Sequence, residues 1–247
     1  MVTLGRWRSA QQYERSFWER AARDIAAGAV SQLTWYQWKA SEMERRIASY
    51  LPSEDRRSAR VLEVGCGPVG IVSFMDWGVR YGLDSLETYY RTNPSLVEER
   101  HTSVQYIPSA AESLPFPDSI FTLVILDNVL DHTKQPQAVL LEISRVLQPS
   151  GILYMALNVR TRWGALIHKL LATLRIDRGH PYSFTIHTAR FALKQQGYTI
   201  LSDSTDDYHA GRSHDIRSSS ITDKIKGFLG ISEFLYYAVS TKTSPKK

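Results

Sequence analysis

The chain has 247 residues, with 43% hydrophobic and 22% charged side chains, which suits an ordinary globular protein with one sizeable α/β core. No apolar run is long enough to span a membrane, residues 1–15 lack the apolar core of a signal peptide, and the single Cys66 excludes a disulfide framework, so we expect a cytoplasmic protein. The net charge of +5 combines an acidic middle with basic flanks, which leaves open a solvated surface, an anionic substrate, a nucleic acid or a membrane surface.

Two amphipathic helices are predicted near the start of the chain, over residues 10–26 and 33–50, because apolar side chains recur there at helical spacing. We expect residues 1–55 to form an N-terminal helical cap and residues 56–247 to form the main domain. The cap is rich in aromatic side chains, which could line an apolar substrate pocket or simply pack helix against helix. These aromatic residues are Trp7, Trp18, Trp35, Tyr36 and Trp38.

Predicted strands and helices alternate through the rest of the chain. Short apolar or β-branched runs predict seven strands, over residues 61–64, 78–83, 104–108, 121–126, 152–157, 198–202 and 234–239. Amphipathic helices are predicted over residues 137–147 and 188–196. Because strands joined through helices tend to be parallel, we expect a mostly parallel sheet with helices on both faces.

A glycine-rich turn follows the first of these strands in the segment VLEVGCGPVG, residues 61–70, and a helix is expected after it. Glycines suit a turn where the backbone bends sharply and a ligand approaches it closely. Asp84 ends the next strand about 20 residues later, where a carboxylate can accept hydrogen bonds from ribose hydroxyls. An aspartate at such a junction can instead cap a helix, and the glycines alone would also suit NAD or FAD.

Four successive segments together resemble the core of class I S-adenosylmethionine (SAM)-dependent methyltransferases of the broad small-molecule type. The segments are VLEVGCGPVG, GLDSL, AAESLPFPDSIFTLVILDNVLDH and LLEISRVLQPSGILYMAL. The resemblance covers residues 60–157 and continues more loosely through GHPYSFTIHTARFALKQQGYTIL. It implies a Rossmann-like α/β fold with a seven-stranded sheet and SAM as the cofactor. The turn departs from the commoner G-x-G-x-G pattern, because Pro68 and Val69 precede Gly70.

The resemblance also implies which residues hold the cofactor. Those expected against its methionine part are Glu63, Gly65, Cys66 and Gly67, and the Glu63 carboxylate suits the ammonium group. Those expected at the ribose and adenine are Asp84, Ser85, Leu86, Ala111 and Glu112. Asp127 and Asn128 close the fourth strand, at the edge of the sheet where the ligand crevice of such folds lies.

Three further features are candidates for contact with the acceptor. His132 follows the fourth strand and could act as a general base or only close the cofactor pocket. His180 and Tyr182 lie in a segment that resembles the family's substrate loop, although Thr185 could make this a structural turn by capping the next helix. The amphipathic stretch Trp163–Leu174, in an expected substrate-side insertion around residues 159–186, suits a membrane surface or a lid packed over the active site.

The activity that the resemblance implies is metal-independent transfer of a methyl group from SAM to an O or N atom of a small molecule, a glycan or a lipid-linked precursor. Such an enzyme belongs to EC class 2.1.1. The segment Asp127-Asn128-Val129-Leu130 replaces the Asn-Pro-Pro-Tyr tetrapeptide of DNA amino-methyltransferases, which argues against DNA bases as acceptors. RNA or protein acceptors, a non-catalytic SAM-binding protein and an NAD-dependent oxidoreductase stay as alternatives. Peripheral contact with a membrane is also open.

Overall fold

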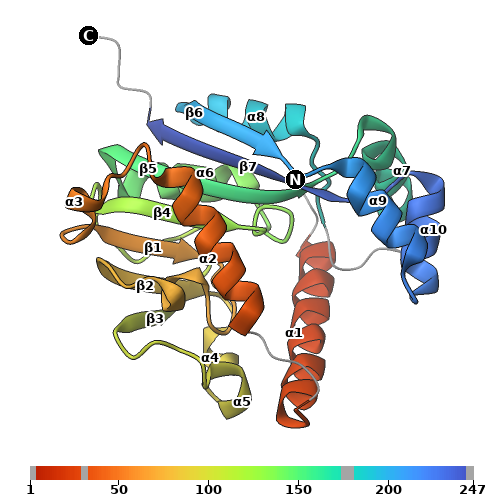
Figure 1. The fold of residues 1–247 in the computed structure, drawn as a ribbon, viewed down its shortest axis with the longest axis horizontal. Helices are drawn as coiled ribbons and strands as arrows, with labels where there is room; N and C mark the ends of the chain where they lie inside the picture. The colour runs from red at the N-terminus through yellow and green to blue at the C-terminus, as the bar shows by residue number, and fades with distance from the viewer. Residues whose placement is uncertain (1–3, 29–32, 174–180, 243–247) are drawn as a thin grey trace.

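The structure is a computed structural model that describes the chain except residues 1–3, 29–32, 174–180 and 243–247. Its strands are β1 (Arg60–Val64), β2 (Val79–Asp84), β3 (Val104–Pro108), β4 (Phe121–Asp127), β5 (Leu147–Val159), β6 (Tyr198–Thr205) and β7 (Phe234–Lys242). They form one sheet in the order β3-β2-β1-β4-β5-β7-β6 (Figure 1). Strands β1 to β5 pair in parallel, and β7 runs antiparallel to both β5 and β6. The predicted seven-stranded, mostly parallel sheet is confirmed.

All seven strands lie where the sequence predicts them, but three extend well beyond the predicted range. β5 starts at Leu147 because this residue pairs with Phe121 ahead of an irregularity in the register. β6 and β7 continue to Thr205 and Lys242 because they pair with each other over this length. Pro149, Ser150 and Gly151 lie outside the predicted strand but are therefore part of β5.

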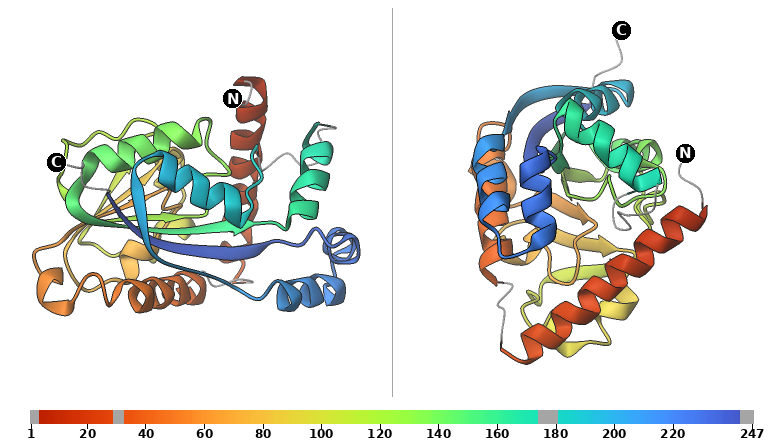
Figure 2. Two further views of the ribbon diagram at one scale, coloured as in Figure 1. Left: turned by 90° about the horizontal axis from the view of Figure 1, so that it is seen from above. Right: turned by 90° about the vertical axis from the view of Figure 1, so that its right-hand side faces the viewer.

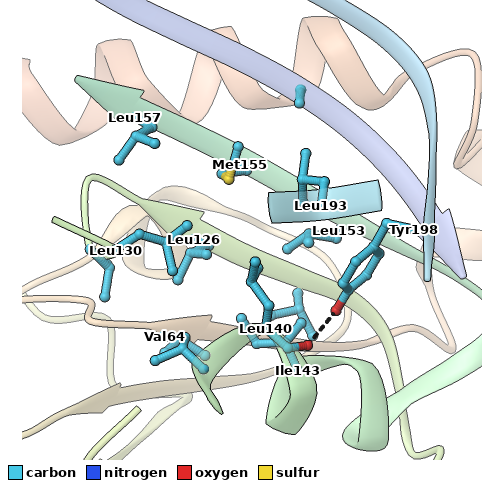
Figure 3. Packing of buried hydrophobic residues seen from close by; sticks show 14 of the residues in the cluster. Val64, Leu126, Leu130, Leu140, Ile143, Leu153, Met155, Leu157, Leu193 and Tyr198 are labelled. Atoms are coloured by element: carbon cyan, nitrogen blue, oxygen red, sulfur yellow. Dashed lines mark hydrogen bonds between the residues drawn. The ribbon is translucent and has the colours of Figure 1, made fainter. Parts of the chain in front are cut away.

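Helices cover both faces of the sheet, as predicted. On one face, α6 (Pro136–Val146) and α8 (Ile186–Gln195) bury Leu140, Ile143 and Leu193 against the central strands (Figure 3). The hydroxyl of Tyr198 donates a hydrogen bond of 2.9 Å to the carbonyl of Leu140 in this layer (Figure 3). On the other face, α2 (Leu33–Ile47) buries Met43 completely against the sheet.

The glycine-rich turn is not followed by a helix, so that prediction is wrong. A single 3₁₀ turn, η1 (Ile71–Phe74), stands between Gly70 and β2. The connection between β1 and β2 spans residues 65–78, and the glycine turn takes up its first part. The place of the missing helix is taken by α2, whose Met43 and Ile47 share a buried cluster with Ile71.

The two N-terminal helices are confirmed, with α1 (Leu4–Ala26) starting earlier than predicted. Figures 1 and 2 show α1 crossing the carboxyl ends of the strands, whereas α2 lies along the sheet and α3 (Ser53–Arg56) leads into β1. α2 contributes side chains to the core of the main domain. Residues 1–55 therefore include part of this core as well as the helix that crosses the ends of the strands. The division of the chain at residue 55 stays a prediction.

Several helices were not predicted as such. They are α4 (Glu87–Tyr90), α5 (Pro94–Val97), α9 (Tyr208–Arg217) and α10 (Ile221–Leu229). The start of α9 and the start of α10 carry the usual polar caps, Asp207 and Ser220, which was the available signal. The amphipathic stretch in the expected insertion around residues 159–186 forms α7 (Arg162–Thr173). None of the helices in the described part of the chain is long and apolar enough to cross a membrane.

The role of α2 in the core can be tested by replacing Met43 with alanine. We expect Met43→Ala to lower the free energy of unfolding by about 2–5 kcal/mol, because it removes a fully buried side chain from the sheet-facing cluster. Gln37→Ala, at an exposed position of the same helix, should change it by less than about 0.5 kcal/mol. Urea denaturation measures both values. Equal stabilities of the two variants would show that α2 does not complete the core.

Candidate functional site

A cavity of about 780 Å³ opens at the carboxyl ends of β1, β2 and β4, where the strand order of the sheet reverses. Such a reversal is the usual ligand site of open α/β sheets, and the volume is in the range of about 300–1,000 Å³ typical of small-molecule sites. All the residues that the sequence assigns to the cofactor line this cavity. They are Glu63, Gly65, Cys66, Gly67, Asp84, Ser85, Leu86, Ala111, Glu112, Asp127 and Asn128.

At two positions of the glycine turn, another side chain lies so close to the backbone that a β-carbon would clash with it. At Gly67, where φ is +63°, a β-carbon would lie 2.9 Å from the hydroxyl oxygen of Tyr36, which reaches over the turn from α2. At Gly70, where φ is +82°, a β-carbon would lie 2.7 Å from Oε2 of Glu63. Gly70 is not among the residues that line the cavity, so its role is to make room for the Glu63 carboxylate.

Two buried carboxylates hold the turn in place. Asp84 accepts hydrogen bonds from the backbone N–H groups of Gly67, at 2.9 Å, and Leu86, at 2.8 Å, and burial raises its pKa to about 6. Glu63 is 2% exposed and accepts a hydrogen bond from the N–H of Val72 at 2.9 Å; burial raises its pKa to about 8. Each carboxylate oxygen has a second lone pair, so both groups can still accept hydrogen bonds from a ligand.

The electrostatic character of the cavity is acidic. Its carboxylates are Glu14, Glu63, Asp84, Glu112 and Asp127. Among the described residues of the wall, these face one lysine, Lys39, and one histidine, His132. This charge balance suits a cationic ligand and opposes the pyrophosphate of a dinucleotide. The helix N-terminus that would bind a pyrophosphate is also missing, because η1 is only one turn. These features fit SAM, which carries a sulfonium and an ammonium group, better than NAD.

Lys39 on α2 is a site residue that the sequence analysis did not identify. Its ammonium group lies 2.8 Å from Oδ1 of Asp127, and both side chains are largely buried. It also lies 4.7 Å above the ring of Trp35. The spacing Trp35-Tyr36-x-x-Lys39 places all three on neighbouring positions of one helix face, and this was the only local signal.

Aromatic side chains from the N-terminal helices form a further part of the cavity wall. Trp7, Trp18, Trp35 and Tyr36 line the cavity as the sequence suggested, whereas Trp38 does not. Residues of α1 that the sequence analysis did not single out complete this wall, namely Gln11, Tyr13, Glu14, Phe17 and Ala21. The ring of Tyr36 stacks on Phe74 with a centroid distance of 6.3 Å.

The remaining cofactor candidates are fixed by hydrogen bonds to neighbouring loops. Oε1 of Glu112 accepts from the N–H groups of Lys134, at 2.8 Å, and Gln135, at 3.2 Å. Oδ1 of Asn128 accepts from the N–H of Asn158 at 3.2 Å and so joins the end of β4 to β5. Burial raises the pKa of the Cys66 thiol, so this residue forms part of the wall rather than a reactive thiolate.

His132 lies in the cavity wall between two carboxylates. Its Nδ1 is 3.7 Å from Oε2 of Glu14, and its Nε2 is 3.7 Å from Oδ2 of Asp131. Oδ1 of Asp131 is buried without a hydrogen-bond partner. The two carboxylates orient the imidazole ring in the cavity wall, and general-base catalysis by His132 stays a prediction.

The predicted substrate loop is placed differently from the cofactor residues. Tyr182 does not line the cavity, and its hydroxyl donates a hydrogen bond of 3.0 Å to the carbonyl of Lys134. Thr185 caps α8 by accepting from the N–H of Thr188, as the alternative of a structural turn requires. His180 lies outside the described residues. None of the described residues of α7 lines the cavity, and the interpretation of this segment as a lid stays a prediction.

Comparison with known structures agrees with this fold. A phosphoethanolamine N-methyltransferase of Haemonchus contortus, solved with phosphomonomethylethanolamine and S-adenosylhomocysteine, superposes with a TM-score of 0.59 and 13% identity. The likeness covers 83% of this chain and 53% of that one. At this identity the comparison concerns the fold alone. The fold is therefore the Rossmann-like fold that methyltransferases of known structure share.

Sequence comparison finds a similarity to methyltransferases over part of the chain. Residues 62–155 match a family model described as a methyltransferase domain. An uncharacterized methyltransferase of Schizosaccharomyces pombe is 30% identical over 127 residues, which cover 47% of this chain and 45% of the relative. A malonyl-[acyl-carrier protein] O-methyltransferase of Enterobacter lignolyticus is 28% identical over 168 residues, covering 63% and 65%. The chain thus spans less than two thirds of the length of either relative. Residues 62–155 are thus similar to a methyltransferase domain, which supports a class I SAM-dependent methyltransferase with SAM as the cofactor.

The buried carboxylate of Glu63 leads to a testable dependence of stability on pH. Its pKa rises from 4.5 in the unfolded chain to about 8 in the folded protein, so the folded state retains a proton that the unfolded state loses. The stability from this group is complete below the unfolded pKa and is lost as the pH rises through the folded pKa. Glu63→Gln can still accept from Val72 but does not titrate. Without ligand, we therefore expect the melting temperature of the wild type to fall relative to Glu63→Gln between about pH 5 and about pH 9.

The matched control is Glu54→Gln, which changes an exposed glutamate outside the cavity and should follow the wild type at every pH. Thermal melts monitored by circular dichroism compare the three proteins. A constant difference between Glu63→Gln and the wild type across this range would contradict a raised pKa for Glu63.

Proposed function

We propose that this protein transfers a methyl group from SAM to an O or N atom of a small molecule, a glycan or a lipid-linked precursor. The observation that carries the proposal is a single cavity lined by two kinds of side chain. Carboxylates stand at the ends of β1, β2 and β4, and we call this part the carboxylate half; aromatic side chains come from α1 and α2, and we call that part the aromatic half, although Trp18 and Tyr36 also reach the glycine turn. A cationic cofactor and a small acceptor would therefore meet inside a single enclosure.

In the carboxylate half, each proposed cofactor contact has a matching group. Glu63 would accept from the ammonium group of SAM, Asp84 from the ribose hydroxyls and Glu112 from the exocyclic amine of adenine. The ammonium group of Lys39 would face the carboxylate in the methionine part of SAM. The ion pair with Asp127 would hold this ammonium group in place. When bound, SAM supplies an activated methyl group on a sulfonium, which is already a good leaving group.

In the aromatic half, the chain would orient the acceptor and exclude water. Trp7, Phe17, Trp18 and Trp35 give this wall large apolar surfaces, which favour a small or apolar acceptor over an extended polymer. Correct orientation of donor and acceptor contributes several kcal/mol in favourable cases, up to about 7–11 kcal/mol. The names of two similar proteins, a malonyl-[acyl-carrier protein] O-methyltransferase and a phosphoethanolamine N-methyltransferase, agree with an acceptor of this kind.

His132 is proposed to accept the proton that an acceptor hydroxyl or amine loses when the new bond to the methyl carbon forms. The carboxylates of Glu14 and Asp131 on its two sides would stabilise the imidazolium that results. Methylation of RNA or protein is the alternative that the basic flanks allow. A non-catalytic SAM-binding protein is a further alternative, and the experiments below distinguish it.

The first prediction concerns the cofactor. We expect isothermal titration calorimetry to show micromolar binding of SAM and S-adenosylhomocysteine, and no comparable binding of NAD. Asp84→Ala should weaken SAM binding at least about tenfold, or about 1.4 kcal/mol, because it removes the ribose acceptor and releases the N–H of Gly67. Asp76→Ala, an exposed aspartate beyond the cavity, is the matched control and should bind like the wild type. Tighter binding of NAD than of SAM would contradict the proposal.

The second prediction concerns His132. After an acceptor has been found by screening with labelled methyl groups, we expect His132→Gln to lower kcat about 100-fold or more while the Kd for SAM stays the same. His187→Gln, an exposed histidine on α8, should leave kcat unchanged. If His132→Gln instead weakens SAM binding with kcat unchanged, His132 is only part of the pocket wall. SAM binding with no transfer to any acceptor would favour the non-catalytic alternative.

A further inference from the structure

The exposed apolar side chains of the protein are concentrated on two helices away from the cavity. On α7, Trp163, Leu166 and Leu170 are all more than half exposed. On α10, the exposed side chains are Ile221, Ile225, Phe228 and Leu229. In the described part of the chain, these are seven of the fifteen large apolar side chains that stand exposed, with exposed fractions from 52% to 75%. Exposed apolar surface on this scale marks a binding surface more often than chance exposure.

The exposed apolar side chains of these two neighbouring helices are together called the α7–α10 face. Leu166 and Leu170 follow Trp163 at steps of three and four residues along α7, and Ile221, Ile225 and Phe228 follow the same rule along α10. The two rows meet where the indole N–H of Trp163 donates a hydrogen bond of 3.0 Å to the carbonyl of Leu229. Figure 1 and the right-hand view of Figure 2 show both helices at the same end of the molecule.

Both helices are fixed to the protein through their other sides, so the outward position of these apolar residues is built into the fold. On α7, Gly164 and His168 are buried. On α10, the buried Gly227 packs against Ile216 of α9, and its carbonyl accepts a hydrogen bond of 2.8 Å from Arg212. Packing against the protein thus uses the small residues of these helices and leaves the large apolar residues outside.

The charges on the two helices are mainly positive. Arg162 and Lys169 lie on α7, and Lys224 and Lys226 lie on α10. Asp223 is the one acidic residue of these two helices, and it pairs with Lys226 at 3.4 Å. Large apolar side chains bordered by basic residues are the chemistry of a helix that lies in the interface of an anionic membrane. A dimer contact or a peptide groove would not need this excess of positive charge.

We propose that the α7–α10 face binds the surface of an anionic lipid bilayer, with its apolar side chains in the boundary between headgroups and acyl chains. β5 ends at Val159, shortly before α7 begins at Arg162, and Asn128 at the cavity is hydrogen-bonded to Asn158 near that end of β5. Membrane binding would therefore hold the cavity end of the sheet toward the bilayer. This proposal does not depend on the proposed methyl transfer.

The test uses sedimentation of the full chain with vesicles of phosphatidylcholine alone and of phosphatidylcholine with about one third phosphatidylglycerol. The variants are Leu166→Ser/Leu170→Ser and Ile225→Ser/Phe228→Ser. The matched control is Leu141→Ser/Phe191→Ser, which replaces side chains of similar exposure, 56% and 55%, on α6 and α8. All changes are at exposed positions, and circular dichroism checks that each variant is folded.

We expect the wild type and the control to bind the anionic vesicles, and each variant of the α7–α10 face to bind at least about tenfold more weakly. Added salt and Lys169→Gln/Lys224→Gln should both reduce the preference for anionic vesicles. No binding of the wild type at low salt, or equal loss in the control, would overturn the proposal. So would a wild-type dimer in analytical ultracentrifugation that becomes monomeric in the α7–α10 variants, because the face would then join two copies of the chain.

Discussion

The short connection between β1 and β2 is the constraint on which the rest of the site depends. Residues 65–78 hold a turn and one 3₁₀ segment but no crossover helix, so the adjacent face of the sheet would remain uncovered. The chain covers it with α2, which comes before the first strand in the sequence. The same helix that closes the core thereby brings Tyr36 over the glycine turn and Lys39 to the end of β4. Packing and site geometry are thus two results of one arrangement.

The buried carboxylates of the site would favour a cationic ligand over an anionic one. Glu63 and Asp84 are buried at a cost that appears as their raised pKa values, and backbone N–H groups offset only part of it. A cationic ligand would supply the missing positive charge, whereas an anionic one would add to the cost. The unfavourable burial of Glu63 and Asp84 would therefore contribute to the binding of a cationic ligand, in addition to the shape of the cavity. The ion pair of Lys39 and Asp127 has the opposite character, because each partner already offsets the other.

The sequence predicts the sheet well because strand order and glycine turns depend on local patterns of apolar residues. All residues proposed for the cofactor come from such segments, and all of them lie together in the structure. Lys39 was not predicted, because its partner Asp127 is 88 positions away and no local pattern connects them. The absence of a helix after Gly70 was missed because the family pattern was followed at this turn. Tyr182 as a substrate contact stays a prediction, since a resemblance of loops does not fix the direction of a side chain.

The position of β7 has a consequence for how the chain reaches its native state. β7 follows β6 along the chain, yet it lies between β5 and β6, and in the described part of the chain β6 pairs with the sheet only through β7. During synthesis, the edge of β5 stays open and β6 has no partner until β7 has left the ribosome. Open strand edges are prone to pair with other chains. A chain cut short before Phe234 would therefore lose more than one strand, and it would leave a half-built sheet exposed to aggregation.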